Sequence, residues 1–190
     1  MRKPSVFIFQ GWAGGKWHTR DFAKALQSNG FVVSDNSSNA DIIVAHSTGC
    51  YGLPTDLKAR LVMLMNPPYW PDKSILERLL KKKGHDTKLA HREHGKRYVF
   101  LKTLWEGVYI VTRPRYTVLA IKHHRKLDFL EHLEDKKVVL VRNENDYFCS
   151  PGIESAVKKY PNVRYIQLPG AHDDYYTNPK PYIDLLLKEL

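Results

Sequence analysis

Short apolar runs without alternating polar residues recur along this chain and constrain its fold more than any other feature. The runs at residues 5–10, 41–45 and 137–141 are dominated by Val, Ile, Leu and Phe. Strands of this composition are buried on both faces, as in parallel sheets covered by helices. Six strands are expected in all, at residues 5–10, 31–33, 41–45, 60–65, 137–141 and 163–168. The alternation of strands and helices predicts an α/β fold of three layers (αβα) around a mostly parallel sheet.

Segments with helical spacing separate these strands. Helices are expected at residues 17–28, 154–160 and 182–190, and over most of 69–136. In the long stretch, one helix face holds Leu101, Leu104, Trp105, Val108 and Val111, a break falls at 113–115, and a second face holds Leu127, Leu130 and Leu133. A helix directly after residue 47 would contain Pro54, so we expect it to be short or broken in two.

Length and cysteine content indicate an ordinary globular chain of one domain, residues 1–190. No apolar run approaches the ~18 residues of a membrane span, and the first residues lack the pattern of a signal peptide. Cys50 and Cys149 provide neither a disulfide framework nor a metal-site spacing. We therefore expect a cytoplasmic protein that uses no metal and no cofactor.

The positive charge of the chain is uneven. The formal charge is +10, and residues 72–137 alone hold 17 Lys and Arg against 9 Asp and Glu. Such an excess favours anionic partners, although a solvated basic helical surface has the same composition. No recognised nucleic-acid-binding motif accompanies it. We therefore expect no nucleic acid partner.

Ser47 stands where the apolar run at 41–45 ends abruptly. The run is followed by His46, Ser47, Thr48 and Gly49, which predicts a buried strand that turns sharply into a helix. The pattern nearly matches the G-x-S-x-G nucleophile elbow, with Ala45 in the first glycine position. The elbow needs small residues two before and two after the serine, because the tight turn brings neighbouring backbone close.

Two further polar candidates follow later strands. Asp146 lies just past the strand at 137–141, and His172 lies just past the strand at 163–168. Ligands in parallel sheets bind outside the carboxyl ends of the strands, at a point where the strand order reverses. Loops at one edge of the sheet are therefore expected to bring Ser47, Asp146 and His172 together.

The order Ser47, Asp146, His172 resembles that of the α/β-hydrolase superfamily of serine hydrolases. Residues 143–151 resemble its acid loop, residues 169–173 its histidine loop, and residues 10–15 its oxyanion loop, with Gln10 where His is common. The resemblance covers nearly the whole chain. It implies a minimal version of the fold without the two leading antiparallel strands, a strand order of 2-1-3-4-5-6, and a helical cap insertion at about residues 67–126.

The resemblance also implies a chemistry for these residues. Ser47 is expected to be the nucleophile, His172 the general base and Asp146 the acid that orients it. Backbone N–H groups of Trp12 and Thr48 are expected to meet the developing oxyanion. Substrate-pocket candidates near the site are Gly11, His46, Tyr69 and Trp70. The expected activity is that of a serine hydrolase, a carboxylesterase or thioesterase, on a small-molecule ester or thioester. A basic cap would suit an anionic substrate.

Other interpretations of the same residues stay open. Ser47 fits an ordinary strand-to-helix cap, Glu144 is a rival acid, and His172 fits a surface histidine. The pairs His91 with His94 and His123 with His124 lack a third ligand at a recognised metal-site spacing. At the level of function, the alternatives are a binding module without turnover, and a basic surface that binds an anionic ligand or membrane.

Overall fold

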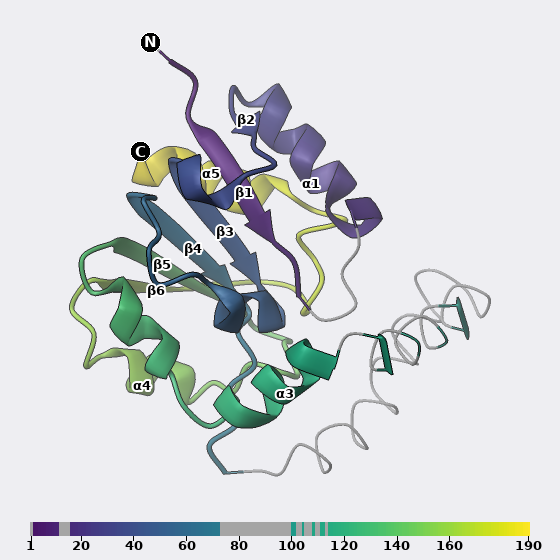
Figure 1. Cartoon of the computed structure of the whole chain (residues 1–190), viewed down its shortest axis with the longest axis vertical. Coiled ribbons are helices and arrows are strands. Elements are labelled where there is room, and N and C mark those ends of the chain that lie inside the picture. Colours follow the sequence, from purple (N-terminus) through teal and green to yellow (C-terminus); the bar gives the residue numbers. More distant parts are fainter. Residues whose placement is uncertain are drawn as a thin grey trace.

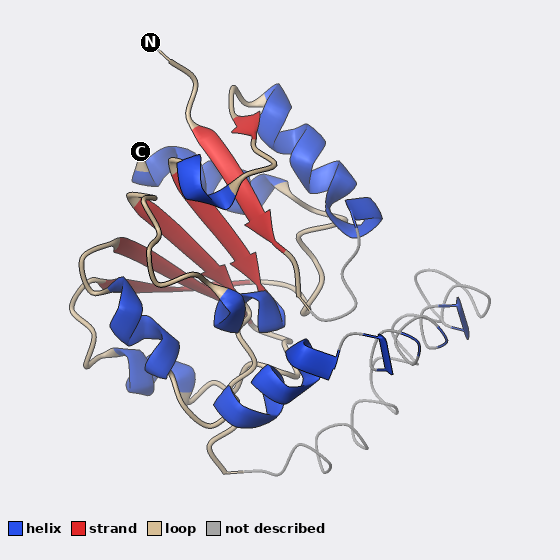
Figure 2. Ribbon diagram, viewed as in Figure 1, coloured by secondary structure: helices blue, strands red, loops and turns tan. Residues whose placement is uncertain are grey.

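A sheet of six parallel strands forms the centre of the structure (Figures 1 and 2). The computed structural model describes residues 2–11, 16–72, 100–101, 104, 108, 111–112 and 114–190. The strands are β1 (Ser5–Phe9), β2 (Val32–Val33), β3 (Ile42–His46), β4 (Leu61–Met65), β5 (Lys137–Asn143) and β6 (Val163–Leu168). Every adjacent pair is parallel, so all six carboxyl ends lie along one edge of the sheet.

The strand order is β2-β1-β3-β4-β5-β6, which confirms the predicted order. The order reverses between β1 and β3, where Val6 pairs with Ile42 and Phe9 pairs with Ala45. Loops that leave neighbouring strands in opposite directions at such a point open a crevice at the carboxyl edge. The residues that follow β1 and β3 therefore occupy the position where folds of this kind bind ligands.

Helices cover both faces of the sheet (Figure 1). They are α1 (Lys16–Ser28), α3 (Pro114–His123), α4 (Ile153–Val157) and α5 (Lys180–Glu189), with the 3-10 helices η1 (Ser37–Asn39), η2 (Ser47–Gly52) and η3 (Asp128–Leu133). Helices α1 and α5 contribute to the core on one face, and η2, η3 and α4 to the core on the other. These layers confirm the predicted αβα architecture.

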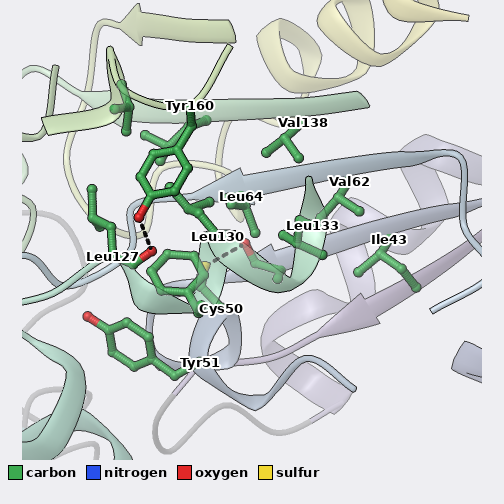
Figure 3. Close-up of a cluster of buried hydrophobic side chains, with 14 of the residues drawn as sticks. Ile43, Cys50, Tyr51, Val62, Leu64, Leu127, Leu130, Leu133, Val138 and Tyr160 are labelled. Atoms are coloured by element: carbon green, nitrogen blue, oxygen red, sulfur yellow. Dashed lines mark hydrogen bonds between the residues drawn. The ribbon is translucent and has the colours of Figure 1, made fainter. Parts of the chain in front are cut away.

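Alternate side chains of β1, β3 and β4 enter different cores, which explains the unbroken apolar runs. On β3, Ile42 and Val44 pack with Phe22 of α1, whereas Ile43 and Ala45 belong to the opposite cluster. The opposite cluster, shown in Figure 3, also contains Leu64, Leu130, Val138 and Tyr160. Its polar atoms have partners: the Tyr160 hydroxyl donates to the Leu127 carbonyl at 3.1 Å, and the Cys50 thiol donates to the Ala45 carbonyl at 3.3 Å.

Several elements differ in detail from the prediction. Leu130 and Leu133 lie in the 3-10 helix η3 rather than in an α-helix, Leu127 directly precedes η3, and all three side chains are buried. A spacing of three residues fits the three residues per turn of a 3-10 helix. The helix after residue 47 is the short 3-10 helix η2, which ends before Pro54 as expected. Strand β2 has only two residues, and its connection to β3 contains only η1.

The predicted cap lies mostly outside the described residues, as do Trp105, His91 and His94. Where it is described, the expected helical face is exposed rather than packed on the domain. Leu101, Leu104, Val108 and Val111 are between 47% and 80% exposed. The residues 67–126 therefore remain a predicted cap. Within the described residues, no helix combines the length and the apolar character that crossing a bilayer requires.

Candidate active site

Four loops meet at the carboxyl edge of the sheet and build a candidate active site. Gly11 follows β1, Ser47 follows β3, Asp146 follows β5 and His172 follows β6. Parallel strands deliver their carboxyl ends to the same edge, so residues more than 100 positions apart lie in contact there. The structure brings Ser47, Asp146 and His172 together as the sequence predicts.

A chain of two hydrogen bonds links the three side chains. The Ser47 Oγ atom is 3.0 Å from His172 Nε2, and His172 Nδ1 is 2.8 Å from Asp146 Oδ2. An ionised carboxylate only accepts hydrogen bonds, so the neutral His172 ring carries its proton on Nδ1. The Nε2 atom is then left with a lone pair directed at the Ser47 hydroxyl, which is the arrangement a general base needs.

Ser47 sits on a backbone that non-glycine residues rarely adopt. Its φ angle is 54°, in the left-handed region, and it is the first residue of the 3-10 helix η2, directly after the extended His46. A non-glycine residue at positive φ costs about 1–3 kcal/mol and persists only where the surroundings enforce it. This sharp turn presents the side chain at the end of the strand, as the nucleophile-elbow pattern predicts.

Asp146, rather than Glu144, is the acid that meets the histidine. Its side chain is fully buried, and its Oδ1 atom accepts hydrogen bonds from the main-chain N–H groups of Phe148 at 2.6 Å and Cys149 at 3.1 Å. Both carboxylate oxygens are therefore committed, one to the main chain and one to His172. The rival Glu144 is exposed, and its carboxylate accepts a bond from Gln167 at 3.3 Å.

Two glycines allow the turn at Ser47 to pack against the loop after β1. A Cβ atom added at Gly11 would lie 2.6 Å from Ser47 Cβ. A Cβ atom at Gly49 would lie 2.7 Å from the Gln10 carbonyl oxygen and 2.8 Å from that of Phe9. The contacts at Gly49 are with backbone atoms, which cannot rotate away as a side chain can. Gly49 therefore has the role that the motif gives it, whereas Ala45 fills the first small position inside the core.

Gly49→Ala is therefore expected to lower the free energy of unfolding by about 1–3 kcal/mol, as inserting a methyl group into a packed interior does. Urea denaturation of wild type and variant measures the difference. The control is Gly152→Ala, where an added Cβ meets only Ser150 Oγ at 3.6 Å, an ordinary contact. Equal stabilities for Gly49→Ala and Gly152→Ala would contradict the close approach.

The oxyanion donors remain a prediction. Trp12 lies outside the described residues. Thr48 directly follows Ser47 at the start of η2, is 3% exposed, and its Oγ1 atom has no hydrogen-bond partner within the described structure. The helix behind it is a 3-10 helix of six residues, so any contribution from its dipole is small.

The candidate pocket residues lie at different depths. Trp70 is 4% exposed and its ring is 5.6 Å from that of Phe148, which is itself 4.8 Å from the His172 ring. Tyr69 pairs with Cys149 as an isolated parallel bridge, so the start of the predicted cap is fixed to the acid loop. Gly11 lies against Ser47. Phe148 therefore contacts His172 directly, and Trp70 packs behind Phe148.

His46 lies beneath the site and is 2% exposed. Its ring is 4.7 Å from that of His172 and 4.5 Å from that of Tyr175. Its Nε2 atom is 2.9 Å from the main-chain carbonyl oxygen of His172. A carbonyl only accepts, so the Nε2 atom carries the proton. Burial, reinforced by the nearby His172 ring, lowers the pKa of His46 to about 4, and the ring is neutral at pH 7.

The depressed pKa of His46 makes folding sensitive to acid. Between about pH 6.5 and pH 4 the unfolded chain protonates this histidine and the folded chain does not, so stability falls as the pH falls, by about 3 kcal/mol over the interval. Urea denaturation at several pH values measures the slope. His46→Gln supplies an amide donor that does not titrate, and its stability is expected to fall less. Parallel slopes for the two proteins would contradict the assignment.

One group of possible metal ligands occurs among the described residues. The ligand atoms of His46, His172 and Asp173 lie within 4.8 Å of one another. The hydrogen bonds already described occupy both nitrogens of His172 and the Nε2 atom of His46. These bonds explain why the three side chains lie close together. The His123 and His124 rings have separate partners, Asp128 Oδ1 at 2.9 Å and the Ile121 carbonyl at 2.7 Å.

The sequence interpretation missed two buried asparagines at this edge. Asn66 and Asn143, both 0% exposed, hold the main chain of the histidine loop. Asn66 stood in the sequence only as part of a strand-ending Asn-Pro-Pro run. Asparagine is the non-glycine residue most often found at positive φ, and Asn66 has a φ angle of 52°. That preference is the one local signal that pointed to it.

Sequence comparison gives no match, either to a protein-family model or to a curated protein. Solved structures do match. The thioesterase domain from the curacin biosynthetic pathway has a TM-score of 0.64 at 13% identity, covering 97% of this chain and 91% of that one. A structure from work on carboxylesterases of the thaumarchaeon Nitrososphaera gargenis has a TM-score of 0.60 at 14% identity, with coverages of 98% and 89%.

A third match is MGS-M2, an α/β-hydrolase enzyme from a Medee basin deep-sea metagenome library. Its TM-score is 0.64 at 13% identity, and the match covers 99% of this chain and 89% of that one. The matches therefore extend over nearly the whole length of both proteins. The chain has the α/β-hydrolase fold.

Proposed function

We propose that this protein is a serine hydrolase that cleaves an ester or thioester through an acyl-enzyme on Ser47. One observation carries the proposal: the hydrogen-bonded series Ser47, His172, Asp146 at the switch point of the sheet. A serine hydroxyl is a weak nucleophile and needs an adjacent base. The esterase and thioesterase among the structural matches act on substrates of this class, which supports the choice.

In the first half of the reaction His172 Nε2 takes the Ser47 proton while Oγ attacks the substrate carbonyl carbon. Asp146 keeps the ring in the required tautomer and stabilises the imidazolium. The tetrahedral intermediate collapses, the bond to the alkoxide or thiolate breaks, and His172 gives the leaving group its proton. The predicted oxyanion donors, the N–H groups of Trp12 and Thr48, would stabilise the negative oxygen by about 2.7–4 kcal/mol each.

In the second half a water molecule attacks the acyl carbon of the acyl-enzyme. His172 takes a proton from the water and returns one to Ser47 Oγ as the carboxylic acid leaves, so the enzyme is restored. The basic segment at 72–137 lies mostly outside the described residues, so a preference for anionic substrates stays a prediction from the sequence. It would be supported by salt-sensitive turnover of an anionic ester relative to a neutral one.

Fluorophosphonate labelling tests the proposal directly. An activated serine displaces fluoride and becomes phosphonylated, and we expect peptide mass spectrometry to place the adduct on Ser47. Labelling is expected to vanish in Ser47→Ala and to persist in Ser155→Ala, since Ser155 is an exposed residue of α4. Folded wild-type protein that neither takes the label nor hydrolyses activated esters would contradict the proposal and favour a binding module.

A further inference from the structure

The main-chain carbonyl of His172 is held by two buried side chains. His46 Nε2 and Asn66 Nδ2 each lie 2.9 Å from this oxygen, and both donate to it. A carbonyl oxygen has two lone pairs, so the two bonds use its full accepting capacity. The donors come from the ends of β3 and β4, whereas His172 follows β6. Two neighbouring strands thereby fix the backbone of the histidine that contacts Ser47.

The orientation of the Asn66 amide follows from its other partner. Its Oδ1 atom accepts a hydrogen bond from the main-chain N–H of Asn143 at 2.8 Å. A backbone N–H can only donate, so Oδ1 faces β5 and Nδ2 faces the His172 carbonyl. The Asn66 main-chain N–H also donates to the Val141 carbonyl at 2.8 Å. Asn66 therefore joins the end of β5 to the histidine loop.

The backbone of Asn66 is held in an unfavourable conformation. Its φ angle is 52°, and among the described non-glycine residues it shares a positive φ only with Ser47. The left-handed conformation costs free energy and is retained where other contacts enforce it. Three hydrogen bonds of a fully buried residue supply that enforcement here.

The preceding residue of the histidine loop, Ala171, is held in a similar way. Asn143 Nδ2 donates to the Ala171 carbonyl at 2.5 Å, and the Asn143 side chain also exchanges hydrogen bonds with the Tyr182 hydroxyl of α5. Two successive carbonyls of the histidine loop are therefore bound by asparagines that leave β4 and β5. These bonds hold the main chain of the histidine loop against the ends of β4 and β5, and they thereby position the His172 ring.

We propose that Asn66 is a positioning residue for the reaction of Ser47, which rests on the function proposed above. It touches neither the substrate nor the reacting atoms, and it acts through the main chain of His172. Removing its amide releases one of the two bonds that set the distance from Nε2 to the Ser47 hydroxyl. A displacement of about 1 Å in a reacting group costs about 100-fold in rate.

The decisive variant is Asn66→Gly, because glycine adopts a positive φ without strain and only the amide is lost. We expect the turnover number for a p-nitrophenyl ester to fall about 100-fold with little change in KM. The rate of fluorophosphonate labelling should fall in parallel. The matched control is Asn162→Gly. Asn162 directly precedes β6, at the edge of the sheet opposite the site, and its side chain donates to the Leu133 and Lys136 carbonyls. We expect wild-type kinetics for this variant.

A second measurement does not depend on turnover. The proton on His172 Nδ1, bonded to Asp146, is expected to give a far-downfield proton NMR signal, which His172→Gln would identify by its absence. We expect this signal to shift or disappear in Asn66→Gly and to be unchanged in Asn162→Gly. If the wild-type protein had no activity, the proposed hydrolase function would be wrong, but the NMR comparison would still test whether Asn66 positions His172. A folded Asn66→Gly protein with an unchanged signal, or with wild-type turnover, would overturn the positioning role.

Discussion

Ser47→Ala is expected to lower the turnover number for an activated ester by about 10⁴- to 10⁶-fold, because no other atom can form the acyl-enzyme. The predicted oxyanion donors and the binding surface would remain, so a small residual rate above that of water is expected. Steady-state hydrolysis of a p-nitrophenyl ester measures the loss.

The fold of this variant is expected to survive. Alanine retains the Cβ atom that faces Gly11, and the positive φ angle is already enforced by the surroundings in wild type. Circular dichroism and urea denaturation check that point. If Ser47→Ala kept more than about a tenth of the wild-type turnover, the nucleophile would have to be a different group. Loss of activity together with unfolding would be resolved by Ser47→Gly, since glycine relieves the backbone strain.

Asp146→Asn is expected to lower turnover by about 10⁴-fold, the effect typical when the acid of such a triad becomes an amide. The two oxygens of Asp146 accept bonds from two main-chain N–H groups and from His172. With Oδ1 still facing the main chain, the new amide group faces His172 Nδ1 as a donor. The neutral ring then carries its proton on Nε2, where it cannot accept the Ser47 proton.

The matched control is Glu144→Gln. Glu144 is the other acid of the same loop, but it is exposed and its carboxylate accepts a hydrogen bond from Gln167. We expect unchanged kinetics for this variant. Steady-state rates and the rate of fluorophosphonate labelling, measured side by side, decide between the two acids. A large loss in Glu144→Gln with a small loss in Asp146→Asn would reverse the assignment.

The sheet was predictable because strands that are buried on both faces are nearly continuous apolar runs in the sequence. In β3 and β4 successive side chains enter opposite cores, so nearly every position is apolar and the strand is visible locally. Residues 127–133 were harder, because a spacing of three suits both an α-helix and the 3-10 helix η3 that forms. Local periodicity does not report which hydrogen-bond pattern tertiary packing selects.

The candidate triad was predictable for a different reason. Ser47, Asp146 and His172 each follow a strand, and a parallel sheet delivers the ends of its strands to one edge. Their mutual distances did not follow from the sequence, because they depend on how each loop is held. The role of Asn66 rests on a bond to a residue 106 positions away and on its backbone conformation. Neither leaves a periodic pattern in the chain.

The separation of Ser47 from His172 also has a consequence for biosynthesis. The two residues lie 125 positions apart, and His172 emerges from the ribosome only after the edge strand β6. A nascent chain that ends just before β6 contains the serine and the acid without the base, so its serine is not expected to be activated towards esters. Covalent labelling of Ser47 therefore reports completion of the whole sheet, and during refolding it would mark the arrival of the native state rather than the collapse that precedes it.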